Sequence, residues 1–293
     1  MTRYEPAIDV ASIRAIDTHV HVQSDSTGRR SLPDELLAAM DAYFGHASRD
    51  LDIDALAEYY RDLGMAAVVF TVDARTALDH VPNSSAEIAE GAARHPDVLI
   101  PFGSVDPRTG RAAIDLARQL VADHGVRGFK FHPTVQGFDP SAQEFAPLWA
   151  AIAELGVPVV VHTGQTGVGA GLPGGYGLKL RYSNPMLLDD VAADHPGLTI
   201  ILAHPSVPWQ DEALSMAAHK ANVYIDLSGW SPKYFSPALV RQAGSILQDK
   251  MLFGSDFPAL TPERWLDDFA QLELKDAVRP KILKGNAVRL LGL

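Results

Sequence analysis

Eight short runs of apolar and β-branched residues recur along this chain, and they constrain its fold more than any other feature. Longer amphipathic patterns typical of helices lie between them, as in residues 52–64, 84–95, 111–125 and 141–156. Strands separated by helices at this spacing predict right-handed βαβ units and a parallel sheet. The expected strands occupy residues 14–22, 66–73, 98–106, 126–133, 157–164, 198–206, 222–230 and 250–258.

The length of the chain suits eight such units arranged in a ring. A (β/α)8 TIM barrel typically needs about 250 residues, and this chain has 293. We therefore expect one α/β barrel domain over residues 1–293, with an open doubly wound sheet as the alternative. Two connections are unusually long, residues 23–50 after the first strand and the glycine-rich 164–185 after the fifth. Both follow strand C-termini, where barrels build active sites, so they are expected to form pocket walls or a lid.

The composition excludes several classes of protein. The chain has no cysteine, which rules out disulfides, thiolate metal ligands and thiol nucleophiles. Its net charge is −11 and no basic stripe is visible, which argues against nucleic-acid binding. No apolar run reaches the roughly 18–20 residues of a membrane span, and the N-terminal residues lack the layout of a secretory signal. We expect a cytoplasmic protein whose partner is a small-molecule substrate, not a nucleic acid or a membrane.

The segment AIDTHVHV, residues 15–22, places a polar side chain at every second position of an apolar stretch. In an extended strand, Asp17, His19 and His21 would lie on one face. Two imidazoles on one face can reach a single metal ion, although two ordinary histidines are the alternative. Asp17 would either anchor a metal-binding histidine or pair with a neighbouring strand.

Histidines gather at the predicted strand ends. Asp256, in the segment GSDFP, lies at the equivalent depth of the eighth strand. Because all strand ends of a barrel point into one bowl, three imidazoles and one carboxylate would meet there and suit Zn²⁺ or a similar ion. The histidines at strand ends are His19, His21, His132, His162 and His204. The remaining six are expected at helix C-termini (His95, His124 and His195) or in loops and on helix surfaces (His46, His80 and His219).

Five motifs in order resemble the amidohydrolase superfamily. They are DTHVH (17–21), VVHTG (160–164), ILAHPS (201–206), FGSDFP (253–258) and the C-terminal KILKGNAVRLLGL. More narrowly, the chain is similar to the amidohydrolase-related branch that includes aminocarboxymuconate-semialdehyde decarboxylase and the resorcylate-type decarboxylases. The resemblance spans essentially the whole chain. The branch is often dimeric, so a homodimer is one state that the resemblance allows, and the sequence leaves the oligomeric state open. The resemblance also implies the site residues: metal ligands His19, His21, His162 and Asp256, and a catalytic His204 close to the metal.

The fourth strand departs from the decarboxylase pattern. Its segment GFKFHP puts Lys130 and His132 on one face, toward the bowl. Other parts of the superfamily use a carboxylated lysine from this strand to bridge two metals. Lys130 could do so, could bind an anionic substrate group, or could pair with Asp226 or Asp256. We expect one divalent metal ion, Zn²⁺ with Mn²⁺ as the alternative, in preference to a second metal held by carboxylated Lys130.

This departure makes hydrolysis the main functional prediction. The protein would be a metal-dependent hydrolase of a small carbonyl-containing substrate, aromatic or carboxylate compounds included, acting through metal-bound hydroxide. Asp256 would move the proton and His204 would stabilise the oxyanion. The alternative is a metal-dependent, non-oxidative decarboxylase of an aromatic or dienoic acid, and a non-catalytic metal- or ligand-binding protein comes third. The expected substrate-binding residues are Lys130, His132, Arg181, Tyr182 and Trp230.

Overall fold

Eight parallel strands form the centre of the molecule in a computed structural model, which describes residues 3–45 and 49–293. Each strand pairs with its neighbour in the sequence, in two sheets ordered β1-β2-β3 and β4-β5-β6-β7-β8. The strands are β1 (Ala15–His21), β2 (Met65–Phe70), β3 (Leu99–Pro101), β4 (Phe129–Phe131), β5 (Val159–His162), β6 (Ile200–Ala203), β7 (Val223–Asp226) and β8 (Met251–Leu252).

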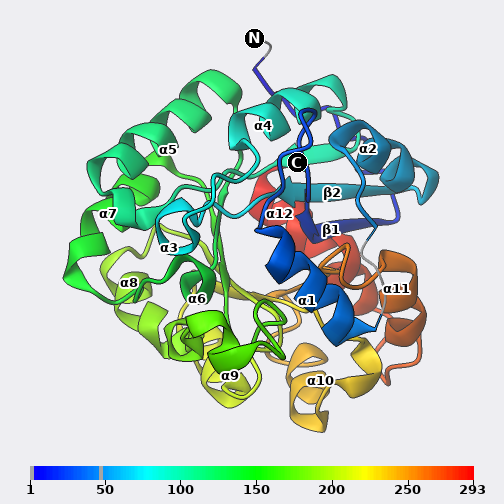
Figure 1. Ribbon diagram of the computed structural model, residues 1–293. Helices are drawn as coiled ribbons and strands as arrows, with labels where there is room; N and C mark the ends of the chain where they lie inside the picture. The colour runs from blue at the N-terminus through cyan, green and yellow to red at the C-terminus, as the bar shows by residue number, and fades with distance from the viewer. Residues whose placement is uncertain (1–2, 46–48) are drawn as a thin grey trace.

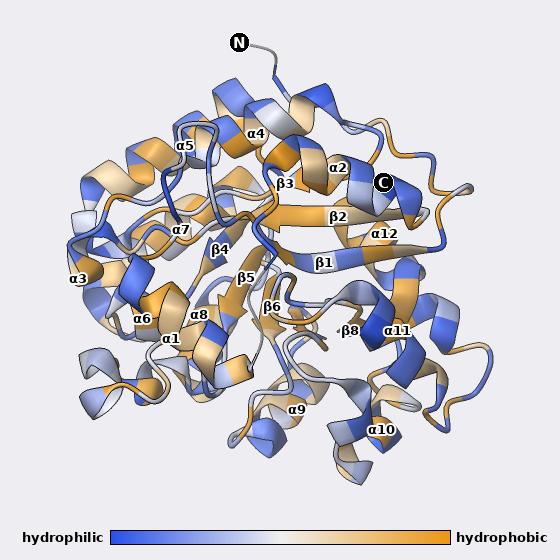
Figure 2. Ribbon diagram, turned by 45° about the vertical axis from the view of Figure 1, so that its right-hand side comes forward, coloured by the Kyte–Doolittle hydropathy of each residue, from blue (hydrophilic) through white to orange (hydrophobic). Residues whose placement is uncertain are grey.

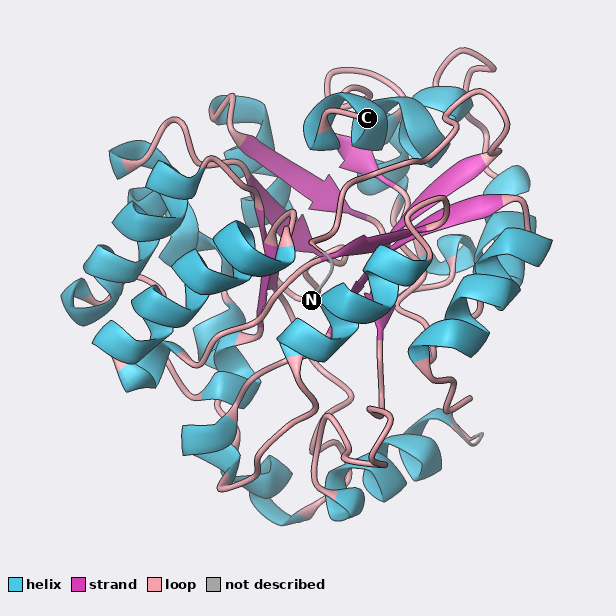
Figure 3. Cartoon of the chain, turned by 90° about the horizontal axis from the view of Figure 1, so that it is seen from above, coloured by secondary structure: helices cyan, strands magenta, loops and turns pink. Residues whose placement is uncertain are grey.

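The two sheets join at two seams, the first between β1 and the segment after β8 and the second between the segment after β3 and β4, and so close into a barrel. Isolated parallel bridges link Val20 to Phe257 and Gly103 to Phe129. At the first seam, the backbone N–H of His21 donates to the carbonyl of Phe257 at 2.8 Å. Figure 3 shows the strands enclosed by helices. The prediction of a (β/α)8 barrel is therefore confirmed, although several strands are shorter than predicted.

Helices surround the strands, as Figure 1 shows. Local signals in the sequence set their ends: the Asp52 side chain accepts a hydrogen bond from the Ala55 N–H at the start of α2, and Gly125 ends α5 in the left-handed conformation. No helix in the described ranges is both long and apolar enough to cross a membrane. The helices are α1 (Asp34–Phe44), α2 (Ile53–Asp62), α3 (Arg75–Leu78), α4 (Ser85–Arg94), α5 (Arg111–His124), α6 (Pro133–Gln136), α7 (Ala146–Leu155), α8 (Asp189–Asp194), α9 (Gln210–His219), α10 (Pro237–Ala243), α11 (Pro262–Ala270) and α12 (Asn286–Leu291).

The alternation of side chains along each strand divides the core into two layers. In β2, Ala66, Val68 and Phe70 belong to an inner cluster, whereas the residues between them pack outward against the helices. Both faces are buried, so β2 is hydrophobic along its whole length, as Figure 2 shows. Ala287 and Leu291 of α12 join the inner cluster, so this helix covers the N-terminal end of the barrel. The opposite end stays available for a site.

The two long connections form structure over that opposite end. The connection after β1 contains α1, which lies in front of the strands in Figure 1. The connection after β5 consists of short 3-10 turns over 173–177, 180–183 and 185–188. Three predicted helix-terminal histidines lie at helix C-termini: His124 ends α5, and His95 and His195 follow α4 and α8. His46 lies outside the described residues.

Candidate active site

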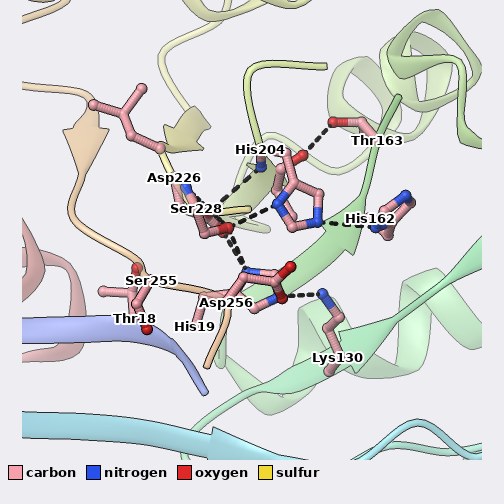
Figure 4. A network of polar contacts seen from close by, with 12 residues as sticks. Thr18, His19, Lys130, His162, Thr163, His204, Asp226, Ser228, Ser255 and Asp256 are labelled. Carbon is pink, nitrogen blue, oxygen red and sulfur yellow. Dashed lines mark hydrogen bonds and ion pairs between the residues drawn. The ribbon is translucent and has the colours of Figure 1, made fainter. Parts of the chain in front are cut away.

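Polar side chains from distant parts of the chain meet at the C-terminal ends of the strands (Figure 4). His19 and His21 come from β1, His162 ends β5, His204 follows β6 and Asp256 follows β8. The ring centroid of His19 lies 5.3 Å from that of His21 and 4.9 Å from that of His204, and His162 lies 4.7 Å from His204. The structure therefore brings together the five residues that the motifs single out.

Asp17 does not share the face of these histidines, which corrects the prediction from strict alternation. The pairing register of β1 with β2 shifts between Asp17 and Val20, so the strand carries a bulge. The Asp17 carboxylate turns toward α2, where it accepts a hydrogen bond from the Tyr60 hydroxyl at 2.8 Å. It also accepts from the backbone N–H of Ser255 at 2.9 Å. Burial raises the pKa of Asp17 to about 7 despite these hydrogen bonds. Asp17 thus ties β1 to its neighbours and does not hold a histidine ring.

Three of the four predicted ligands present donor atoms to one point. Asp256 Oδ1 lies 3.2 Å from His19 Nε2 and 3.2 Å from His21 Nε2, and all three donor atoms are within 4.8 Å of one another. The fourth, His162, contacts His204 at 3.0 Å through Nδ1. Its Nε2 is buried and has no hydrogen-bond partner among the described residues. Buried imidazole nitrogens beside a carboxylate fit a divalent ion such as Zn²⁺ or Mn²⁺.

The electrostatics keep these imidazoles neutral, which is the form that binds metals. Burial, together with the nearby Lys130, lowers the pKa of His19 to about 3. Burial is also the main reason that the pKa of His162 lies well below the ordinary value. For Asp256, burial raises the pKa, but the imidazoles of His19, His204 and His21 outweigh it and hold that pKa well below its usual range. The site therefore combines neutral nitrogens with an ionised carboxylate.

Asp226, the last residue of β7, anchors the cluster from below. Its Oδ2 accepts a hydrogen bond from His19 Nδ1 at 2.9 Å, and its Oδ1 accepts from the backbone N–H groups of Ser228 at 3.0 Å and His204 at 3.3 Å. Burial raises the pKa of Asp226, but the interaction with the His19 imidazole outweighs burial and leaves the pKa well below its usual range. Sequence reasoning considered Asp226 only as a partner of Lys130.

Lys130 lies beneath the site and is fully buried. Its Nζ is 2.9 Å from His19 Nε2 and 5.0 Å from the centroid of the Phe70 ring. Burial lowers the pKa of Lys130 to about 8, although Asp226 and Asp256 oppose that shift. The amine therefore faces the predicted metal-binding nitrogen of His19 and not the solvent.

A cavity of about 680 Å³ opens above this cluster. Its floor includes His21, His162, His204 and Asp256. Of the described residues that line it, Arg264 on α11 is the only lysine or arginine. The part of the glycine-rich connection closest to β5 lines the cavity, as the sequence predicted. Apolar and aromatic side chains form much of the wall: Leu32, Met40, Tyr43, Phe44, Val72, Val135, Val168, Trp230, Tyr234 and Leu260.

The five predicted substrate-binding residues fall into three groups. His132 and Trp230 line the cavity, and the His132 ring stacks on His162 with centroids 3.7 Å apart. Lys130 is buried below the floor. Arg181 and Tyr182 lie elsewhere, because the connection after β5 runs away from the cavity beyond residue 168: Tyr182 lines a separate cavity, and Arg181 stacks on the Tyr182 ring at 5.1 Å. The structure therefore places these two residues outside the cavity, contrary to the expectation that they face the bowl.

Backbone strain concentrates at the same place. His204 and Asp256 have φ values of 71° and 72°, and Ser206 has 58°, although none of them is glycine. Such conformations cost roughly 1–3 kcal/mol each and cluster at functional sites. Gly229 also adopts a positive φ, and a Cβ built there would lie 2.6 Å from His204 Nδ1. Sequence reasoning missed Gly229 and Ser228. The motif IDLSGW carries a signal for them, because it directly follows the end of β7.

A family model described as amidohydrolase matches residues 16–293. This chain belongs to the amidohydrolase family. A curated relative, gamma-resorcylate decarboxylase from Rhizobium sp. (strain MTP-10005), is 23% identical in an alignment that covers 83% of this chain and 85% of the relative. The family explains why the ordered motifs lie at strand ends.

Two solved structures extend this comparison. An uncharacterised TIM-barrel protein from Bordetella bronchiseptica superposes with a TM-score of 0.75 at 25% identity, covering 95% of this chain and 98% of its own. A dihydroxybenzoic acid decarboxylase from Polaromonas sp. JS666, with bound manganese and the inhibitor 2-nitroresorcinol, gives a TM-score of 0.67 at 19% identity, covering 96% and 97%. Both cover nearly the whole chain and support the same barrel fold.

Proposed function

We propose that this protein is a metal-dependent, non-oxidative decarboxylase of a hydroxylated aromatic acid. The observation that carries the proposal is a cluster of neutral imidazoles and an ionised carboxylate at the floor of a largely apolar cavity. The relative named gamma-resorcylate decarboxylase supports this reaction over the hydrolysis that the sequence alone favours. Hydrolase therefore gives way to carboxy-lyase as the main interpretation.

The proposed metal ligands are His19, His21, His162 and Asp256. The neutral state of the histidines and the ionised state of Asp256 suit this role. Lys130 already contacts the nitrogen that His19 would offer, and because this nitrogen has a single lone pair, the amine must move aside when an ion binds. The arrangement suits one metal ion better than two ions bridged by a carboxylated Lys130, because the Lys130 amine is fully buried and does not line the cavity.

The cavity suits a flat, anionic ring. Valine, leucine and methionine side chains line the cavity together with Trp230, and they can hold an aromatic ring by burying its faces. Arg264 at the rim can attract and orient an acidic substrate, because its guanidinium is the single positive side chain among the described lining residues. A small aromatic acid satisfies both features.

The chemistry requires a proton to move from oxygen to carbon. When bound, a divalent ion supplies positive charge that holds a carboxylate and a neighbouring hydroxyl and makes that hydroxyl more acidic. The ionised Asp256 side chain, about 20% exposed, accepts the hydroxyl proton and returns it to the ring carbon that bears the carboxylate. The carbon–carbon bond then breaks, CO₂ leaves, and its electron pair restores the phenolate, which takes a proton from water. His204 lines the floor beside this path and orients the reacting group.

The reaction is tested by measuring CO₂ from gamma-resorcylate and a panel of mono- and dihydroxybenzoates, with protein loaded with Mn²⁺ or Zn²⁺. We expect CO₂ release with at least one ortho-hydroxylated acid, its loss on chelation and its return on metal addition. Asp256→Asn should abolish turnover, whereas Ser141→Ala, far from the cavity, should leave it unchanged. Hydrolysis would instead convert ester, lactone or amide substrates without CO₂. Turnover of those compounds alone would overturn the proposal and restore the hydrolase prediction.

A further inference from the structure

The buried hydroxyl of Ser228 contacts three polar groups at once. It donates to Asp226 Oδ1, and it lies 2.8 Å from His204 Nδ1 and 3.0 Å from His19 Nδ1 (Figure 4). A serine hydroxyl has one proton to donate and two lone pairs that accept. These three contacts therefore use its full hydrogen-bonding capacity.

The carboxylate decides the direction of each hydrogen bond. Asp226 Oδ1 already accepts from the backbone N–H groups of His204 and Ser228, so it acts as an acceptor and the Ser228 hydroxyl donates to it. No proton is then left for the two imidazoles, and each must donate from Nδ1 to the serine oxygen. The other contacts of His19 agree. Its single Nδ1 proton is shared between the Ser228 oxygen and Asp226 Oδ2 at 2.9 Å, and on the opposite edge of the ring Lys130 can donate to Nε2 at 2.9 Å.

The tautomer of His204 determines the tautomer of His162. A neutral imidazole carries one proton, so a His204 that is protonated at Nδ1 has a bare Nε2. That Nε2 lies 3.0 Å from His162 Nδ1, which must therefore donate to it. His162 is then bare at Nε2, the buried atom that has no partner among the described residues.

We propose that Ser228 is a positioning residue that fixes the tautomers of His204 and His162. Because the Ser228 hydroxyl donates to Asp226, its oxygen accepts from His204 Nδ1, and His204 Nε2 in turn accepts from His162 Nδ1. This chain of hydrogen bonds, here called the relay, leaves Nε2 of His162 free for a divalent ion. The inference rests on the proposed metal role of His162, but the tautomers themselves can be observed without a metal. Asp226 keeps its backbone donors when Ser228 is changed, so only the relay is removed.

The test compares Ser228→Ala with the parent by long-range ¹H–¹⁵N correlation of ¹⁵N-histidine-labelled, metal-free protein at pH 8, where an ordinary imidazole is neutral. His162 and His204 signals are assigned from single His→Gln variants. We expect protonated Nδ1 and bare Nε2 for both rings in the parent, and mixed tautomers for both rings in Ser228→Ala. Affinity for Zn²⁺ should fall by about 10–100-fold, the range found when partners of metal-binding histidines are removed.

Ser141→Ala is the matched control. Ser141 also donates to the aspartate two residues earlier, with its Oγ 2.7 Å and its backbone N 3.0 Å from Asp139 Oδ1, but it lies outside the cavity. Its tautomer signals and Zn²⁺ affinity should match those of the parent. A proton on Nε2 of either ring in the parent would overturn the inference. So would unchanged tautomers and Zn²⁺ affinity within twofold of the parent in Ser228→Ala. If no acid releases CO₂ but the tautomers change as expected, the proposed reaction fails and the relay stands.

Discussion

Replacing Gly229 by alanine should damage catalysis more than stability. Gly229 has φ +72°, and left-handed backbone costs an alanine about 1–2 kcal/mol. The new Cβ would lie 2.6 Å from His204 Nδ1 and 3.2 Å from Asp256 Oδ2. To restore an ordinary contact of 3.4 Å, the His204 ring must retreat by about 0.8 Å. Misplacement of this size can cost about 100-fold in rate, so we expect CO₂ release to fall by about 10–100-fold.

Gly156→Ala isolates the backbone contribution. Gly156 ends α7 with φ +68°, and nothing lies within 4 Å of the Cβ position. Urea unfolding should show a loss of about 1–2 kcal/mol in this variant, with unchanged CO₂ release. Gly229→Ala should lose at least as much stability and also most of its turnover, while it keeps its metal. If both variants lose the same stability and neither loses turnover, the position of His204 does not matter to the reaction.

Three further outcomes follow from the contacts described. His162→Ala should lose the metal on dialysis, measured by elemental analysis, because a ligand is removed, whereas His204→Ala removes only the hydrogen-bond partner of that ligand and should retain part of the metal while it loses turnover; equal metal loss in both would contradict the separate roles. Arg264→Gln should raise KM for an acidic substrate several-fold with little change in kcat, and a fall in kcat alone would argue against a binding role. Tyr60→Phe removes a donor to the buried aspartate of β1 and should cost about 1.5–3 kcal/mol in urea unfolding. Tyr4→Phe, which deletes a buried hydroxyl without a hydrogen-bond partner in the described chain, should cost far less, and equal losses would contradict this reasoning.

The sequence was sufficient to predict the barrel because the pattern of an apolar strand followed by a helical connection repeats along the chain, with eight strands in all. Each strand is a short apolar run and each connection is long enough for a helix, so one misjudged boundary changes little. β8 spans only Met251–Leu252, against a predicted run over 250–258, yet Asp256 still reaches the mouth. Parallel topology puts every strand end at the same edge, and this carries His19, His162 and Asp256 together without any detail of side-chain packing.

Strict alternation failed where the backbone departs from a regular strand. The bulge in β1 turns Asp17 toward Tyr60, and nothing in the letters AIDTHVHV marks an extra residue. Arg181 and Tyr182 lie outside the cavity for a related reason, because a long glycine-rich connection can leave the bowl after a few residues. Except for Asp17, the side chains predicted at or just after a strand end gather at the site, whereas those predicted farther along a connection lie outside the cavity.

Lys130 shows how far the same reasoning extends. Its place between Phe129 and Phe131 was enough to predict that the lysine points inward, since its neighbours pack outward. Depth was not predictable, because the neighbouring strands decide how far an inward side chain lies below the rim. The structure puts its amine against His19, fully out of solvent and outside the lining of the cavity. Because Lys130 does not line the cavity, its presence in GFKFHP is a weaker argument against decarboxylation than the sequence alone suggested.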